Sequence, residues 1–131
     1  MAYDTMYQAL VRSPLAMCEL SAREFMAAHR RGYVIAIDFD GTLCSDAYPD
    51  IGNAREAIIK LAKEAQRYGA NIVLWTCREG DLLNEALTWC KKHGLQFAAV
   101  NDNIPARKAF WGNNTRKVGY DEIWDDRAVR V

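Results

Sequence analysis

The stretch "VIAIDFDGTLCSD", residues 34–46, passes from a run of apolar side chains directly into two aspartates separated by one residue. The apolar run has the length and the β-branched content of a buried strand, and an Asp-Gly pair is typical of the turn that follows one. Carboxylates at the end of a buried strand must reach water, a cation or a hydrogen-bond donor. Asp38 and Asp40 therefore raise the question of which partners meet them.

The composition predicts a single globular domain. The chain has 131 residues, half of them hydrophobic, and 17 basic side chains balance 17 acidic ones. This balance gives no support to nucleic acid as a partner, although local patches remain possible. No apolar run approaches the roughly 18 residues of a membrane span, so we expect no membrane partner. The scattered cysteines are typical of reduced thiols in a cytoplasmic protein; they are Cys18, Cys44, Cys77 and Cys90.

Strand and helix patterns alternate along the chain. Strands are predicted over residues 33–39, 70–76, 95–100 and 120–124, helices over 53–69 and 81–94, and an irregular segment over 101–119. Because the strands are apolar on both faces, we predict an α/β fold: a Rossmann-like parallel sheet flanked by helices. Residues 33–131 would form this domain. Residues 1–32 would be an N-terminal helical extension, in which Ser21 and Glu24 make a capping box.

Acidic and hydroxyl side chains follow several of these strands. Asp38 and Asp40 follow the first strand, Thr76 ends the second, and Asp125 and Asp126 follow the last. Ligands of parallel α/β sheets bind at the carboxyl ends of the strands. Clustered carboxylates there would repel one another unless a cation neutralised them, and Mg²⁺ prefers such oxygen ligands together with a phosphate. A carboxylate beside the metal ion can also attack phosphorus.

Four motifs in this order resemble those of the haloacid dehalogenase-like superfamily of phosphohydrolases. They are "DFDGT" (38–42), "WTCR" (75–78), Lys117 and "IWDDRA" (123–128). The resemblance implies a hydrolase that forms an aspartyl-phosphate. Asp38 would be the nucleophile and a ligand of Mg²⁺. Asp40 would be the general acid and base, and its backbone carbonyl would bind the metal ion.

The same resemblance assigns the remaining catalytic and metal-binding residues. Thr76 and Lys117 would hold the transferring phosphoryl group, with Lys108 as the alternative lysine. Asp126 would bind the metal ion directly, and Asp125 would support it through water or hydrogen bonds.

Further residues near these motifs are candidates for substrate binding: Gly41, Thr42, Cys77, Arg78 and Lys108. For two of these residues, Arg78 and Cys77, the sequence allows a second role. Arg78 would contact a substrate anion or cap the following helix, and Cys77 would be a substrate contact or an inert buried thiol.

No cap domain fits into this chain. The intervals from Asp38 to Thr76 and from Thr76 to Lys117 are already filled by the predicted elements. We expect an open site, covered by a flap over residues 43–50 in which Tyr48 reaches the substrate, or by a second subunit of a homo-oligomer. The predicted function is a Mg²⁺-dependent phosphatase of a small phosphate ester or nucleotide. The alternatives are a phosphotransferase, a phosphatase of nucleic-acid ends and a non-catalytic module that binds phosphate and metal for regulation.

Overall fold

The computed structural model describes residues 32–131 of the chain. The helical extension predicted for residues 1–32 lies outside the described residues except for Gly32. In chain order the described elements are β1 (Val34–Ile37), α3 (Glu56–Arg67), β2 (Asn71–Leu74), α4 (Gly80–Lys92), β3 (Ala99–Val100), α5 (Pro105–Trp111) and β4 (Glu122–Trp124). None of the helices in this part of the chain is both long and apolar enough to cross a membrane.

The four strands form one parallel sheet in the order β3-β2-β1-β4. The chain therefore begins at an inner strand, moves outward through β2 to β3, and returns to the other side of β1 as β4. Strand order reverses between β1 and β4, where Ile37 lies opposite Trp124. The carboxyl ends of these two strands are thus the place where a parallel α/β sheet opens a ligand crevice. The predicted fold class, an α/β sheet flanked by helices, is confirmed.

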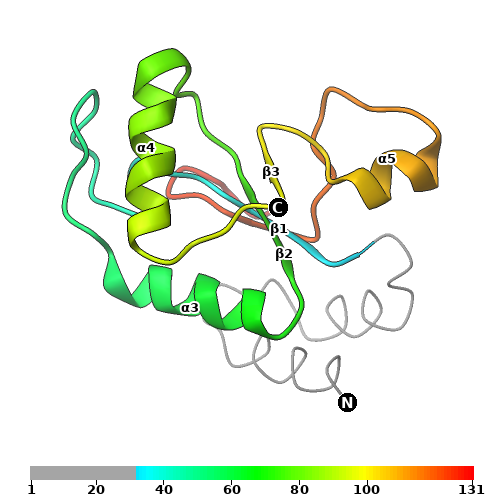
Figure 1. Cartoon of the computed structure of the whole chain (residues 1–131), viewed down its shortest axis with the longest axis horizontal. Helices are drawn as coiled ribbons and strands as arrows, with labels where there is room; N and C mark the ends of the chain where they lie inside the picture. The colour runs from blue at the N-terminus through cyan, green and yellow to red at the C-terminus, as the bar shows by residue number, and fades with distance from the viewer. Residues whose placement is uncertain (1–31) are drawn as a thin grey trace.

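Successive side chains of β1 and β2 point to opposite faces of the sheet and build two cores. Ile35 and Ile37 pack with residues of α3 and α4 in the larger core, which also contains Ile59, Ala62, Ala86 and Cys90. Val34 packs with Val73, Ile104 and Val118 in a smaller core on the other face. Figure 1 accordingly shows α3 and α4 on one side of the strands and α5 on the other. Because crossovers between parallel strands are right-handed, the connection that carries the chain back across the sheet from β3 to β4 lies on the opposite face from α3 and α4.

Both long helices end in the same glycine motif. Gly94, with φ of 82°, donates its N–H to Lys91, and the next N–H, that of Leu95, reaches back to the Cys90 carbonyl at 3.0 Å. Gly69 and Ala70 make the equivalent bonds after α3. This Schellman arrangement satisfies carbonyls that the helix leaves unpaired and needs a left-handed residue. It places the start of each following strand against the core.

Two predicted elements differ from the structure. The predicted strand over 95–100 is only two residues long, because Leu95 belongs to the glycine motif that ends α4. The segment predicted as irregular, 101–119, contains α5, which begins with Pro105 and ends at Trp111, just before Gly112 with φ of 73°. Proline in the first turn and glycine after the last are helix signals, so this helix was detectable from the sequence.

Candidate functional site

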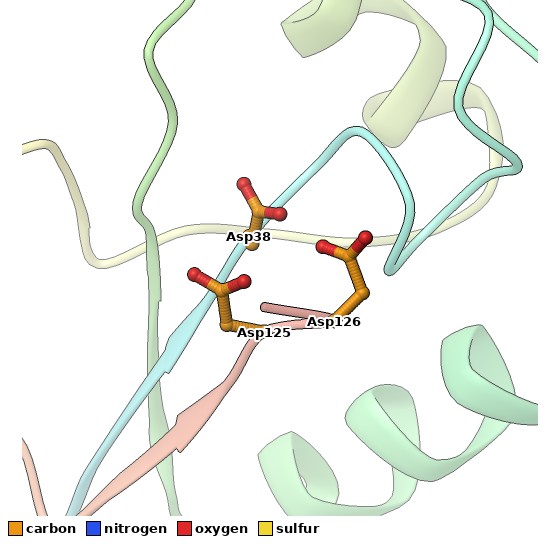
Figure 2. Close-up of side chains that lie close together, drawn as sticks. All are labelled: Asp38, Asp125 and Asp126. Carbon is orange, nitrogen blue, oxygen red and sulfur yellow. The ribbon is translucent and has the colours of Figure 1, made fainter. Parts of the chain in front are cut away.

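Three carboxylates meet where strand order reverses. Asp38 directly follows β1, and Asp125 and Asp126 directly follow β4. The Asp38 N–H donates to the Trp124 carbonyl at 2.9 Å, which continues the pairing of the two strands to their ends. As a result, one oxygen of each carboxylate lies within 4.8 Å of the others. Figure 2 shows the three side chains gathered at this edge of the sheet.

The electrostatics of this acidic triad favour a bound cation. The pKa of Asp38 is raised from 3.8 to about 7, mainly by burial and also by the charges of Asp125 and Asp126, while a hydrogen bond from the Phe39 backbone opposes the rise. Within residues 32–131, no lysine or arginine forms an ion pair with the triad. Three carboxylates at this spacing offer only oxygen ligands, the donor set that Mg²⁺ and similar hard cations prefer. The residues present therefore fit a divalent cation.

Gly41 and Thr42 bring the two strand ends together. Gly41 has φ of 86°, and a Cβ atom at this position would collide with the carboxylate of Asp126. The Asp126 N–H donates to the buried hydroxyl of Thr42 at 3.2 Å. A residue with a Cβ atom at position 41 would therefore displace the Asp126 carboxylate, and the Thr42 hydroxyl helps to place Asp126. The substrate contacts predicted for Gly41 and Thr42 stay predictions, since the structure gives both residues this local role.

Asp40 does not join the triad but forms an ion pair with Arg78. The Nε and Nη2 atoms of Arg78 donate to the two Asp40 oxygens at 2.8 and 2.7 Å. These hydrogen bonds raise the pKa of Arg78, although burial partly opposes them. The guanidinium is therefore turned toward Asp40 and away from open solvent. Neither of the two roles considered for Arg78, contact with a substrate anion and capping of α4, describes this placement.

Thr76 and Cys77 line a cavity of about 440 Å³ that reaches Asp38, with Trp75, Asn101 and Asp125 as further walls. The Thr76 N–H donates to the Asn101 side chain at 2.8 Å, and the Thr76 hydroxyl accepts the Arg78 N–H at 3.1 Å. Cys77 is exposed, so the alternative of a buried thiol is wrong.

Asn101 is a site residue that we did not predict. It is the one non-glycine residue in the described part of the chain with positive φ, 51°, and its side chain orders the end of β2. Asparagine directly after an apolar run is a signal for this conformation.

A second cavity, of about 380 Å³, also borders Asp38. It is lined by Asp38, Asp40, Asp46, Tyr48, Thr76, Cys77, Asp125 and Arg127. Tyr48 stands in the predicted flap over residues 43–50 and is 58% exposed. A larger cavity of about 580 Å³ runs along α4, but it contains none of the predicted site residues. The two cavities beside Asp38 are therefore the candidate substrate site.

Neither candidate lysine lines these two cavities. Lys108, in α5, forms an ion pair with Asp102 at 2.6 Å. Lys117 is exposed on the loop between α5 and β4. The choice between the two lysines stays open.

The loop that carries Lys117 is tied to the end of β3 through the buried side chain of Asn103. Its amide donates to Asn114 and to the Thr115 carbonyl at 2.9 and 3.1 Å, and accepts the Gly119 N–H at 2.6 Å.

Comparison with sequence profiles of protein families and with curated proteins finds no match. A solved structure of a conserved protein from Bacteroides thetaiotaomicron is similar to this chain, with a TM-score of 0.66 and 39% sequence identity. The similarity covers 75% of this chain and 78% of the Bacteroides protein. With this identity over most of both chains, the protein belongs to the same family as that conserved Bacteroides protein.

Proposed function

We propose that this protein is a Mg²⁺-dependent phosphohydrolase of the haloacid dehalogenase-like type, with Asp38 as its nucleophile. The observation that carries the proposal is the convergence of three carboxylates within 4.8 Å at the point where strand order reverses, beside two cavities. The order of the four motifs in the sequence supports the same assignment. A purely structural acidic cluster would be costly, because each ionised carboxylate raises the free energy of the others.

The reaction has two displacements at phosphorus. In the first, an oxygen of Asp38 forms a bond to phosphorus, the ester P–O bond breaks, and Asp40 gives its proton to the leaving oxygen. In the second, a water molecule attacks the phosphorus of the aspartyl-phosphate, Asp40 takes a proton from that water, and the bond to Asp38 breaks to release phosphate. Each Asp40 oxygen accepts one hydrogen bond from Arg78 and keeps a lone pair for the proton.

The other site residues bind and orient the phosphoryl group. Asp38, Asp125, Asp126 and the Asp40 carbonyl would hold Mg²⁺, which would neutralise charge that develops on the phosphoryl oxygens. Thr76 reaches the same cavity as Asp38 and can donate its hydroxyl to a phosphoryl oxygen. Lys117 is the preferred second donor, because its loop leads directly into β4 and Lys108 is already paired with Asp102.

The substrate that fits this site best is a small phosphate ester or nucleotide. The chain between the motifs forms no cap domain, and the two cavities beside Asp38 are of small-molecule size. The balanced formal charge gives no support to nucleic acid. We further propose a cytoplasmic location, which the scattered free thiols support.

The test is a phosphate-release screen over sugar phosphates, nucleotides and phosphorylated nucleic-acid ends, with Mg²⁺ and with chelator. We expect the wild type to release phosphate only with Mg²⁺. Asp38→Asn should be inactive, whereas Asp81→Asn, an exposed carboxylate on α4, should behave as the wild type. Mass spectrometry of rapidly quenched wild type should find one phosphoryl group on the peptide that contains Asp38.

Each alternative function predicts a different result in the same assay. A phosphotransferase would pass the phosphoryl group to an added alcohol in place of water. A regulatory module would bind Mg²⁺ and phosphate without turnover of any substrate. Activity that survives Asp38→Asn or the chelator would refute the proposed mechanism.

A further inference from the structure

Arg78 is the most deeply buried charged side chain near the site, with none of its side-chain surface exposed. Beyond its two bonds to Asp40, it reaches the backbone of the flap. Nη1 donates to the Pro49 carbonyl at 3.1 Å, and Nη2 donates to the Asp50 carbonyl at 2.9 Å. Four of the five N–H groups of the guanidinium thus hold two separate partners, the Asp40 carboxylate and the tip of the flap.

Two aromatic rings complete the surroundings of this guanidinium. Its central carbon lies 5.1 Å from the centroid of the Phe39 ring and 5.2 Å from that of the Tyr48 ring. Phe39 is fully buried in the core, whereas Tyr48 is in the flap and lines the cavity next to Asp38. Arg78 therefore joins the core, the second aspartate of the first motif and the substrate-facing ring of the flap.

We propose that Arg78 is a positioning residue that fixes Asp40 and the tip of the flap, residues 48–50, relative to each other. The inference rests on the proposed function where it concerns catalysis. The Nη2 atom donates both to Asp40 and to Asp50, so a movement of the flap shifts the group that orients Asp40. The position of the flap over the substrate and the orientation of the proposed acid and base are coupled through this one side chain.

The geometry requires arginine. A planar guanidinium can stack on aromatic rings while it donates in the plane to a carboxylate and to two carbonyls. A lysine ammonium carries the same charge but has three donors on one atom, so it cannot reach Asp40 and both flap carbonyls in this arrangement. Arg78→Lys therefore keeps the charge and removes the coupling.

The test compares Arg78→Lys with the matched control Arg67→Lys, since Arg67 also lies over a tyrosine ring, that of Tyr68 at 4.9 Å, at the end of α3. Two quantities are measured: steady-state kinetics on the best substrate of the screen, and hydrogen exchange of the amides of residues 45–53. We expect Arg78→Lys to lower kcat by about 10²-fold, as for a misplaced catalytic group, with a smaller change in KM. Flap exchange should become roughly 10-fold faster or more as the local opening becomes easier. Arg67→Lys should change neither.

Asp40→Asn provides a second variant that does not depend on the folding of Arg78→Lys. The hydrogen bonds described for the Asp40 side chain are those with Arg78, and none of them reaches the tip of the flap directly. If the coupling exists, Asp40→Asn should nevertheless speed exchange in residues 45–53. Added guanidinium ion should partly restore kcat to Arg78→Ala, which a merely structural role would not predict.

The outcomes separate this inference from the proposed function. Normal kcat and normal flap exchange in Arg78→Lys would overturn the inference while the phosphatase assignment stood. Faster exchange with normal kcat would overturn the positioning of Asp40. A wild type without any turnover would refute the proposed function and the catalytic part of the inference together, and flap exchange in Asp40→Asn would then decide the mechanical coupling alone.

Discussion

Charged groups lie at both ends of strands β1 and β4, and the two ends differ in whether these charges are paired with opposite charges. At the amino end, the Asp121 carboxylate accepts the Val34 N–H at 2.7 Å and an Arg107 N–H at 2.6 Å. Arg107 also donates to the Gly32 carbonyl at 3.0 Å. At the carboxyl end, Asp38 and its two acidic neighbours form no ion pair with any lysine or arginine of residues 32–131.

This difference distinguishes charges that stabilise the fold from charges that are available for function. The amino-end pair is buried, with 3% and 1% of the two side chains exposed, and its charges balance. The carboxyl-end triad concentrates negative charge at the mouth of two cavities. Substitutions at the first end should therefore change stability, and those at the second should change metal binding and turnover.

The largest effect is expected from Asp38→Asn. Loss of the proposed nucleophile should lower kcat by on the order of 10⁴-fold or more, by analogy with enzymes that form covalent intermediates. The free energy of unfolding, measured by urea denaturation without metal, should not fall, because asparagine removes a desolvated charge and its repulsion from two acids. A large loss of stability in this variant would contradict the contrast between the two strand ends.

Breaking the amino-end pair of Arg107 and Asp121 should lower the stability of the protein. Arg107→Met removes the guanidinium that pairs with the buried Asp121 carboxylate, and we expect the free energy of unfolding to fall by about 3 to 5 kcal/mol. Urea denaturation measures this loss. Lys108→Met is the matched control: it breaks an exposed pair, in which Lys108 and Asp102 are 36% and 43% exposed, so its cost should be much smaller. Equal losses in the two variants would show that the buried pair has no special role.

The proposed mechanism needs a lysine that supplies positive charge to the phosphoryl group during turnover, and Lys117 is the preferred candidate. Lys117→Ala should therefore reduce kcat/KM by about 10²-fold to 10³-fold, as for the loss of one donor to a developing oxyanion. Lys108→Ala should cost little turnover, because this ammonium is already paired with Asp102. Steady-state kinetics of both variants decide between them, and the reverse result would transfer the role to Lys108.

The raised pKa of Asp38, about 7 against an ordinary value of 3.8, would make binding of the proposed metal ion depend on pH. Between these two values the unfolded carboxyl is ionised while the folded one keeps its proton, so the stability of the metal-free protein falls as pH rises. The proposed Mg²⁺ would bind the ionised form and should therefore stabilise the protein more at pH 8 than at pH 6.

The free energy of unfolding should rise by about 2.7 kcal/mol when the Mg²⁺ concentration is 100 times its Kd. Thermal unfolding with and without Mg²⁺ measures it, and Asp38→Asn should lose the pH dependence. A stabilisation by Mg²⁺ that is equal at the two pH values would place the cation elsewhere.

The smallest effect is expected at the contact that joins the first and last motifs. Thr42→Val keeps the shape of the side chain but leaves the Asp126 N–H without its acceptor. We expect a loss of about 1 kcal/mol in unfolding free energy and a weaker affinity for Mg²⁺, because Asp126 is then less well placed. Calorimetric titration with Mg²⁺ checks the second effect. Thr88→Val, which loses an exposed hydroxyl bond within α4, is the control.

Much of the fold could be predicted from local sequence patterns. The apolar runs before Asp38 and Thr76 predicted β1 and β2, and Gly69 and Gly94 predicted where the two long helices end. The third strand was predicted too long because an apolar residue such as Leu95 is equally typical of a strand and of the position that closes a glycine motif after a helix. Local patterns cannot separate these two uses of one buried side chain.

The amino-acid sequence by itself determined which strand ends carry acids, and the parallel sheet that follows from its α/β pattern makes Asp38, Asp125 and Asp126 candidates for one site. Only the tertiary structure decided the partners of the other charges, such as Arg78 for Asp40 and Arg107 for Asp121. Backbone conformation depends on neighbouring residues, whereas an ion pair between distant residues depends on strand order, register and the path of each loop. Arg78 therefore changed from a candidate substrate contact into the link between Asp40 and the flap.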